Sequence, residues 1–133
     1  MVLPAFTNVQ LMGGVMKARK KLKIPYPNLY AVPGHHDKAD EFNRVQRGHQ
    51  NYLEMLDDFR LMALIGGLKN PYLNAFGGVC FSLGSYLYQV GYSDMSLDVK
   101  FARHKKGAMI KWVGYLIALG TSISFSGSLL NFW

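Results

Sequence analysis

Cysteine and acidic residues are both scarce in this 133-residue chain. The single cysteine, Cys80, excludes a disulfide within the chain. Aspartate and glutamate number 8 against 15 lysines and arginines, which gives a net charge of +7. The sequence also lacks a serine, histidine and aspartate triad, a glycine-rich phosphate loop and a carboxylate pair with hydrolytic spacing. These absences argue against the common hydrolytic and phosphate-binding sites.

Charged residues are absent from two long stretches, residues 70–93 and 112–133. Each is long enough to cross about 30 Å of hydrocarbon as an α-helix. A third charge-free stretch, residues 1–16, is shorter and contains Asn8 and Gln10. Hydrophobic residues make up 50% of the chain and charged residues 17%. Both figures favour a membrane protein, although the mean hydropathy of +0.04 does not.

The basic residues are concentrated in two runs, residues 17–23 and 100–111, which flank these stretches. The positive-inside rule places both runs on the cytoplasmic side and the turn at residues 69–71 on the opposite side. Cations in such positions are typical of membrane helices rather than of a nucleic-acid surface, so no nucleic acid is expected as a partner. A signal peptide is not expected, because the apolar part of the N-terminus precedes the cations.

We therefore expect an all-α fold, an integral membrane four-helix bundle that forms a single domain over residues 1–133. The helices are predicted at residues 2–21, 40–67, 71–92 and 108–130. Small residues in the last two helices, such as Gly84 and Gly120, would let neighbouring helices pack closely.

Residues 23–39 contain three prolines and are interpreted as a loop. Within it, His35 and His36 are adjacent, so their rings would not converge on one metal ion if the segment were a helix or a strand. No other histidine or cysteine at ligand spacing supports them. We therefore expect solvated histidines and no metal site.

One face of the second predicted helix carries Arg47, Asn51 and Glu54, which are four and three residues apart. Polar groups at membrane depth are costly, so they usually face a bundle interior or a wet cavity and mark a site. Tyr88 and Tyr92 share a face near the end of the third helix. Together these groups predict a pocket for an anionic, peptide-like ligand beside an apolar slot open to lipid. Two other interpretations stay open: an aromatic belt for the tyrosines, and an internal ion pair for Arg47 with Glu54.

Three motifs carry a resemblance to a known family. They are KARKKLKIPYPNLYA from residue 17, FNRVQRGHQNYLEM from residue 42 and YLYQVGY from residue 86. With them the chain resembles the membrane-associated glutathione and eicosanoid metabolism family, and most of all its type 3 microsomal glutathione S-transferases. The likeness extends over about residues 15–130, and RGHQN followed by LE is its most specific part.

The resemblance implies a homotrimer in the lipid bilayer of the endoplasmic reticulum or a mitochondrion, with glutathione bound between neighbours near the cytosolic face. It implies an enzyme that joins this co-substrate to lipophilic electrophiles, reduces lipid hydroperoxides, or acts like leukotriene C4 synthase. The residues at its glutathione-contacting positions are Arg19, Arg47, His49, Asn51, Glu54, Tyr88 and Tyr92.

The chain departs from the family pattern at the cation that stabilises the glutathione thiolate. Relatives have a Lys-Arg pair or a single arginine after the GY motif. Here Lys100 stands at the expected place and Arg103 is the reserve, so these are the candidate catalytic residues. A lysine keeps the positive charge but loses the planar fork of arginine.

The second helix also departs from the family, because it carries Asp57, Asp58 and Arg60 where relatives have proline and apolar residues. Whether the chain is an enzyme therefore stays open. One alternative is an active transferase or peroxidase. The other is a catalytically silent relative that serves as an accessory subunit of a larger membrane complex, for example a mitochondrial respiratory complex. A scaffold that presents a ligand without turning it over is a lesser third.

Overall fold

The computed structural model describes residues 2–131 of the chain. These residues form five α-helices joined by loops, and they contain no strand. The helices are α1 (Val2–Leu22), α2 (Ala39–Gly67), α3 (Pro71–Tyr92), α4 (Val99–Lys105) and α5 (Ile110–Leu129). Residue 1 and residues 132–133 of the expected single domain lie outside the described residues. The fold is all-α, as the sequence predicts.

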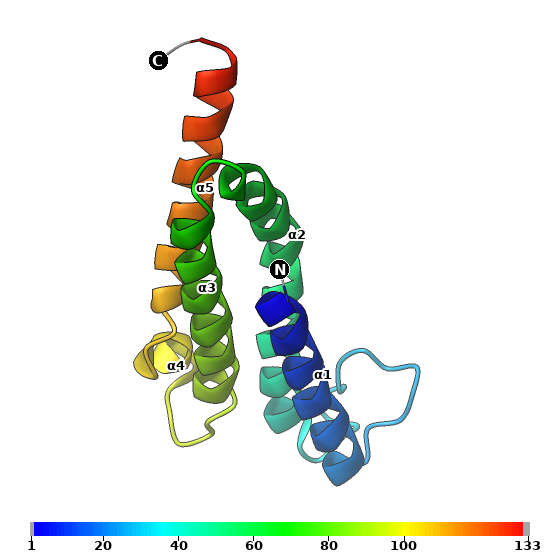
Figure 1. The fold of residues 1–133 in the computed structure, drawn as a ribbon. Helices are drawn as coiled ribbons and strands as arrows, with labels where there is room; N and C mark the ends of the chain where they lie inside the picture. The colour runs from blue at the N-terminus through cyan, green and yellow to red at the C-terminus, as the bar shows by residue number, and fades with distance from the viewer. Residues whose placement is uncertain (1, 132–133) are drawn as a thin grey trace.

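Figure 1 shows α1 beside α2 and α3 beside α5, with a short turn joining α2 to α3 at one end of the molecule. The helix α4 packs against the other end of α3, where the C-terminal end of α1 also lies. Both basic runs of the sequence are therefore at the same end of the bundle. Because α1 is shorter than α2 and begins part-way along it, α1 leaves the last turns of α2 uncovered.

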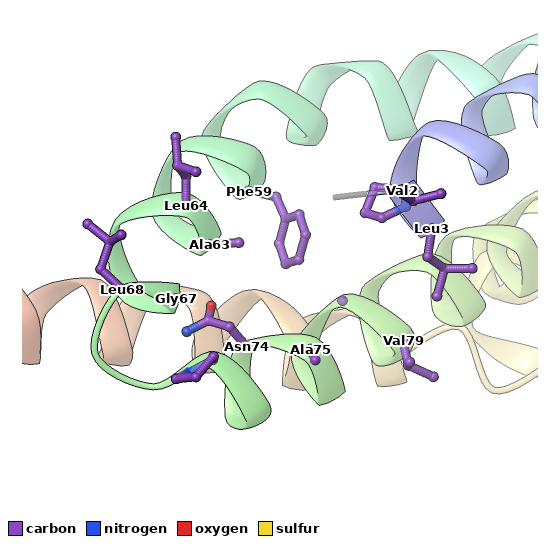
Figure 2. Close-up of a pocket in the computed structure, with 13 residues that line it drawn as sticks. Val2, Leu3, Phe59, Ala63, Leu64, Gly67, Leu68, Asn74, Ala75 and Val79 are labelled. Carbon is purple, nitrogen blue, oxygen red and sulfur yellow. The ribbon is translucent and has the colours of Figure 1, made fainter.

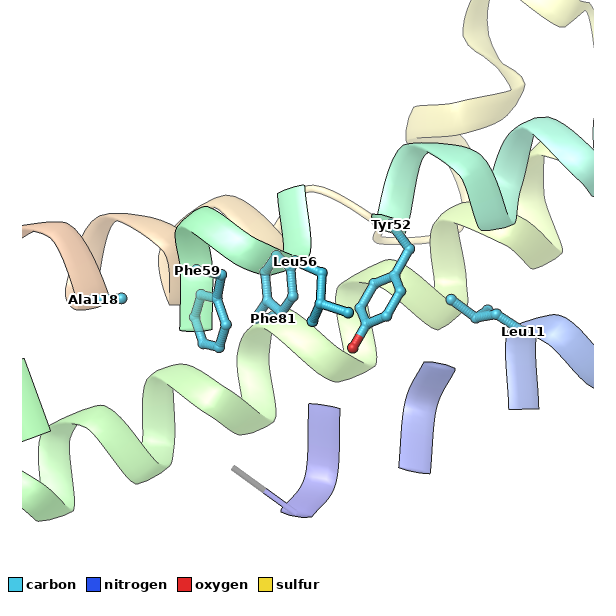
Figure 3. Close-up of a cluster of buried hydrophobic side chains, with 6 residues drawn as sticks. All are labelled: Leu11, Tyr52, Leu56, Phe59, Phe81 and Ala118. Carbon is cyan, nitrogen blue, oxygen red and sulfur yellow. The ribbon is translucent and has the colours of Figure 1, made fainter. Parts of the chain in front are cut away.

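The hydrophobic core lies between α1, α2, α3 and α5 (Figure 3). Its buried cluster consists of Leu11, Tyr52, Leu56, Phe59, Phe81 and Ala118. The rings of Phe59 and Phe81 stack with their centres 4.0 Å apart, and the ring of Tyr52 lies 5.6 Å from that of Phe81. The hydroxyl of Tyr52 donates a hydrogen bond to the backbone carbonyl of Pro4. The polar end of this tyrosine is thus paired inside the bundle, which joins α1 to α2.

α3 and α5 approach each other closely because glycines line their contact. A Cβ atom on Gly84 would lie 2.3 Å from the backbone nitrogen of Lys111. A Cβ atom on Gly114 would lie 2.3 Å from the carbonyl oxygen of Gly77. No larger residue fits at these places unless a backbone moves, as expected for membrane helices that pack through small residues.

Among the described helices, α5 is the one that is long and apolar enough to cross a membrane by length and composition. The composition of α3 is less apolar because its polar residues are on its inner face: Asn74, Ser85 and Gln89 are buried, whereas Phe76 and Leu83 are exposed. This is the reverse of the pattern in a water-soluble protein. The mean hydropathy of α3 therefore understates how apolar its outer face is.

The glycine contact between α3 and α5 predicts that Gly84→Ala destabilises the bundle by about 1–3 kcal/mol, because the added methyl group overpacks the contact. Gly78→Ala on the same helix is the matched control, since a Cβ atom there meets nothing within 4 Å. We expect the control to be neutral or to stabilise α3 by up to about 1 kcal/mol. Unfolding of both variants in detergent measures the difference, and equal effects would contradict the close approach.

Candidate functional site

A lysine on the first turn of α5 is buried between three helices. Only 4% of Lys111 is exposed, and its Nζ donates a hydrogen bond of 2.6 Å to Oδ1 of Asn51 on α2. The same ammonium group lies 4.0 Å from the ring centre of Tyr88 on α3, which is a cation–π contact. The nearby carboxylate on α2, that of Glu54, pairs with Arg47 instead. Lys111 is thus held by an amide oxygen and an aromatic face.

A cavity of about 240 Å³ lies beside this lysine, at the end of the bundle that contains the basic runs. Its walls come from α2, α3, the end of α4 and the start of α5. The lining residues are Asn51, Tyr88, Arg103, His104, Ala108, Met109, Lys111 and Trp112. Two cations, an amide and aromatic rings therefore share one space, which favours an anionic ligand with both polar and apolar parts.

Arg47 and Glu54 form an ion pair two turns apart on α2, with Nη1 and Oε1 separated by 2.5 Å. The internal ion pair that the sequence left open is therefore present. The two side chains are 39% and 44% exposed, so a ligand can reach both. Such an exposed pair contributes only about 0–1 kcal/mol to stability. Neither side chain lines the cavity beside Lys111, but each residue is about one helical turn from Asn51, which does.

Tyr88 and Tyr92 stack on α3 with their ring centres 5.7 Å apart. Tyr88 is buried and lines the cavity, whereas Tyr92 is half-buried. Ser85, one turn before Tyr88, is also buried. Because Tyr88 faces Lys111 inside the bundle, it does not belong to an aromatic belt that faces lipid.

Arg19 and His49, two of the expected glutathione contacts, have partners in other parts of the protein. The guanidinium of Arg19 donates to the carbonyl oxygens of Ile24 (3.4 Å), Pro25 (3.4 Å) and Asn28 (2.8 Å), which are all in the loop after α1. His49 contacts α1 through a 3.0 Å hydrogen bond between its Nε2 and Oδ1 of Asn8. Neither residue lines the cavity beside Lys111.

The two candidate catalytic cations lie on α4, a short helix where the sequence indicates only a longer connection. The carboxylate of Asp98 caps this helix by accepting a 2.9 Å hydrogen bond from the backbone nitrogen of Lys100. The side chain of Lys100 is exposed and does not line the cavity. Arg103 does line it, and its Nε donates to Nε2 of His104 at 3.2 Å. The structure therefore brings Arg103, but not Lys100, to Lys111.

Polar contacts hold the loop that connects α3 to α4. Arg44 on α2 donates to the carbonyl oxygens of Asp94 (3.4 Å) and Leu97 (3.1 Å). Hydrogen bonds from neighbouring side chains lower the pKa of the Asp94 carboxyl to about 2. The Ser96 hydroxyl makes the largest contribution, and Lys106 makes the next largest. Asp94 is therefore charged at neutral pH and keeps its 3.0 Å ion pair with Lys106, which holds α4 near the cavity.

A sequence model described as the MAPEG family matches residues 1–126, which is nearly the whole chain. The chain belongs to the MAPEG family. This is a membrane family that includes glutathione transferases, peroxidases and eicosanoid synthases, and its proteins use glutathione. The match confirms, for the family as a whole, the resemblance that the three sequence motifs carry.

Lys111 is the buried cation of this MAPEG protein's site that sequence reasoning missed, and His104 and Trp112, which also line the cavity, were missed as well. The sequence groups it with the cations at the membrane surface, because it ends the second basic run. One signal could have found it. Lys111 directly precedes the charge-free stretch 112–133 and is three residues before Gly114, so both lie on one face of a helix. A small residue on that face indicates a helix contact, and therefore a buried ammonium.

The contacts of Arg19 predict that Arg19→Gln loosens the loop after α1. Loss of the charge-assisted hydrogen bonds should speed hydrogen exchange of the backbone amides of Ile24 and Asn28 by about tenfold or more. Lys20→Gln is the matched control, because Lys20 is exposed. Exchange measured by mass spectrometry or NMR should change only in the Arg19 variant. Equal exchange in both variants would show that Arg19 does not anchor the loop.

Proposed function

We propose that this chain is a membrane-bound glutathione transferase or peroxidase that joins glutathione to lipophilic electrophiles or reduces lipid hydroperoxides. The observation that carries the proposal is the ammonium of Lys111, which Asn51 holds over the ring of Tyr88 at the wall of a cavity. Membership in the MAPEG family supports the general kind of activity. The finer assignment to a type 3 microsomal glutathione S-transferase rests on the sequence resemblance.

The charged groups of the cavity, together with Arg47 and Glu54 one helical turn on either side of Asn51, match those of glutathione, a tripeptide with two carboxylates, one ammonium group and a thiol. Arg47 suits a carboxylate, because its guanidinium can bind both oxygens in parallel, and Glu54 suits the ammonium group. Binding would replace the ion pair between these residues by two ion pairs with the ligand. Asn51 and Tyr92 are able to bind the peptide groups. Arg19 and His49 stay expected contacts of the bound peptide.

We place Lys111 and Arg103 beside the thiol. Positive charge there favours the thiolate, which is the nucleophilic form. In the transferase reaction, the thiolate forms a carbon–sulfur bond, and the displaced electron pair leaves with the departing group or takes up a proton on the product. In the peroxidase reaction, the thiolate attacks the terminal peroxide oxygen, the oxygen–oxygen bond breaks, and the alkoxide takes up a proton and leaves as the alcohol. The thiol of a second glutathione then displaces water from the sulfenic acid that has formed, which gives the disulfide. Lys100 is the weaker candidate because it is exposed.

We further propose that α1, α2, α3 and α5 all cross the bilayer and that three copies assemble. The exposed apolar side chains on the outer face of α3 support the crossing, because they suit contact with lipid or with a neighbour. The exposure of Arg47 and Glu54 supports the trimer, since a neighbouring subunit could close the site on that side. The endoplasmic reticulum and a mitochondrial membrane both fit this arrangement.

A second candidate function is an accessory subunit of a larger membrane complex that has lost its chemistry. The side chain of Asp57 on α2 is 93% exposed, and its Oδ1 lies 3.8 Å from Nη1 of Arg60. Asp58 is exposed as well. Charges on a membrane helix are costly unless they find a partner, so this surface would suit another protein chain with complementary charge.

The position of Lys111 predicts that Lys111→Met weakens glutathione binding by about tenfold or more and abolishes the ultraviolet absorbance of bound thiolate. Methionine keeps the length of the side chain and removes the charge. Lys100→Met is the matched control and should change both quantities little. Titration of each purified variant with glutathione measures them. If Lys100→Met abolished the thiolate signal and Lys111→Met did not, the assignment of the cation would be wrong.

The number of copies in the assembly separates the two candidate functions. For the enzyme we expect native mass spectrometry in detergent to show three copies, and glutathione to bind saturably at or below millimolar concentration. For the accessory subunit we expect one copy among other proteins in the native membrane and no binding at millimolar glutathione. The second result would remove the enzyme proposal.

A further inference from the structure

A second cavity, of about 520 Å³, lies between α1 and α3 at the end of the bundle that contains the basic runs, and we call it the α1–α3 cavity. Its lining residues are Gln10, Gly13, Gly14, Lys17, Val45, Tyr86, Gln89, Val90 and Ser93. None of them lines the cavity beside Lys111, so the two spaces are separate.

Gln89 on α3 has an amide group whose orientation is fixed. The residue is 8% exposed, and its stem packs so closely against α2 that a Cβ atom on Gly48 would lie 2.7 Å from its Cγ. Its Nε2 donates to the carbonyl oxygens of Leu11 (3.2 Å) and Val45 (3.3 Å). A flip of the amide would bring its oxygen against these two acceptors, so the nitrogen stays where it is.

The Oε1 atom of Gln89 accepts no hydrogen bond from the described residues, and it is accessible. A Cβ atom on Gly14, which lines the cavity, would lie 3.1 Å from this oxygen. Among the described residues, the buried side-chain atoms without a partner belong to Gln46, Asn74 and Ser82, so this oxygen is not sealed in the interior. Because the bundle holds the stem and the nitrogen, the oxygen is the part of Gln89 that opens into the cavity. A fixed acceptor of this kind calls for a hydrogen-bond donor on a ligand.

Lys17 is the one charged side chain among the described residues that line this cavity. It is exposed, and none of the ion pairs between described residues includes it. Lys17 begins the first basic run, so it is the deepest cation of that run in the proposed membrane crossing of α1. Its ammonium group is therefore available to an anion at the level of the lipid phosphates.

The order of the two groups along α1 limits the choice of ligand. Lys17 is three residues after Gly14, which is about 4.5 Å further towards the membrane surface. The anion of the ligand must therefore lie nearer the surface than the donor that reaches Gln89. In a phospholipid the glycerol lies directly below the phosphate, and a lysophospholipid has a free hydroxyl group on it. A diacyl lipid has its second chain esterified to that oxygen, and head-group hydroxyls lie on the water side of the phosphate.

The rest of the cavity suits a hydrocarbon chain. A Cβ atom on Gly13 would meet nothing within 4 Å, so this wall is open. Val90 and the exposed ring of Tyr86 are apolar walls on α3. Gln10 is seven residues before Lys17, so the cavity extends for about 10 Å along α1. That length accommodates the glycerol and the first part of one chain, and the remainder of the chain would stay in the surrounding lipid.

We propose that the α1–α3 cavity binds a lysophospholipid, whose phosphate pairs with Lys17 and whose glycerol hydroxyl donates a hydrogen bond to Oε1 of Gln89. The single chain lies along Gly13, between α1 and α3, and continues into the bilayer. The depth of the two groups rests on the proposed membrane crossing of α1, whereas the glutathione chemistry plays no part. The inference adds a lipid-binding site to the protein whether or not the cavity beside Lys111 is catalytic.

A larger cavity, of about 550 Å³, lies at the other end of the bundle and provides an internal reference (Figure 2). It lies between the start of α1, the last turns of α2 and the first turns of α3, and Phe59 and Val79 are among its apolar walls. None of the described residues that line it is charged. Its walls cannot select a phosphate, so labelling there measures the non-selective partition of a hydrocarbon chain.

The test uses a lysophosphocholine that carries a photoreactive diazirine near the start of its chain, with the intact protein in detergent. Cross-linked peptides are mapped by mass spectrometry. Three unlabelled competitors are octadecyl lysophosphocholine, its methyl ether at the glycerol hydroxyl, and octadecyl glycerol, which lacks the phosphate. We expect saturable labelling of residues 10–17 and 86–93 that lysophosphocholine displaces. The ether lacks the donor and octadecyl glycerol lacks the anion, so each should compete about two- to tenfold less well there, but not at residues 59–79.

Matched variants separate the proposed contacts from general damage. In Gln89→Met the preference for lysophosphocholine over its ether should disappear, whatever the absolute affinity. In Lys17→Gln the preference over octadecyl glycerol should disappear, whereas Lys20→Gln should keep it, because Lys20 is exposed in the same run but does not line the cavity. Gly13→Leu should fill the cavity and reduce labelling. Gly120→Leu is its control, since Gly120 is equally open and lies outside the lining.

Several outcomes would overturn the proposal. They are equal competition by lysophosphocholine and either of the other two competitors, unchanged preferences in Gln89→Met or Lys17→Gln, and an equal loss of labelling in the two glycine variants. Labelling that does not saturate would also overturn it, because the cavity would then hold only water or bulk detergent. Glutathione binding to the same samples is an independent measurement. Its absence would remove the enzyme proposal and leave the lipid competition unchanged, so the two failures are distinguishable.

Discussion

The contact on which the rest of this protein depends joins Lys111 to Asn51 across the ring of Tyr88. A buried ammonium group is costly in a membrane protein unless partners replace its water, and here an amide and an aromatic face do so. Because the three groups come from α5, α2 and α3, this contact sets how the three helices meet. The hydrogen bond between Asn74 and Thr121 does the same for α3 and α5 at the other end. The apolar core around Phe81 lies between these two polar layers.

The positions of the long helices could be predicted from the sequence, because the features that mark helix ends are local. The four predicted ranges end within two residues of the ends of α1, α2, α3 and α5. Charge-free stretches, the glycine pair at the end of α2 and Pro71 at the start of α3 mark these limits. α4 has only seven residues, and one capping carboxylate and one buried residue, Ala102, hold it. Such a short helix depends on tertiary contacts, which a local pattern does not contain.

The candidate site could be predicted from the sequence only in part. The line of Arg47, Asn51 and Glu54 follows from helical spacing, and so does the pairing of Tyr88 with Tyr92. Which cation reaches the cavity depends instead on how closely α5 approaches α3, and the backbone contact at Gly84 decides that distance. The contacts of Arg19 likewise depend on the path of the loop after α1. Periodicity thus reveals groups on one helix, whereas groups that meet from different helices need the packing itself.

The outer face of α3 has a consequence for how this protein tolerates substitution. Apart from Phe81 and Tyr88, which are buried, the large apolar side chains of this helix mostly point away from the bundle, and the other inward positions mostly hold small or polar residues. An outward position of that kind requires only an apolar side chain, so leucine, phenylalanine and valine are interchangeable there. The inward positions demand a particular size and a particular hydrogen-bonding group. Substitutions that preserve function should therefore be concentrated on the outer, apolar face of α3. Substitutions of the inward-facing serines, glycines and amides should be tolerated poorly.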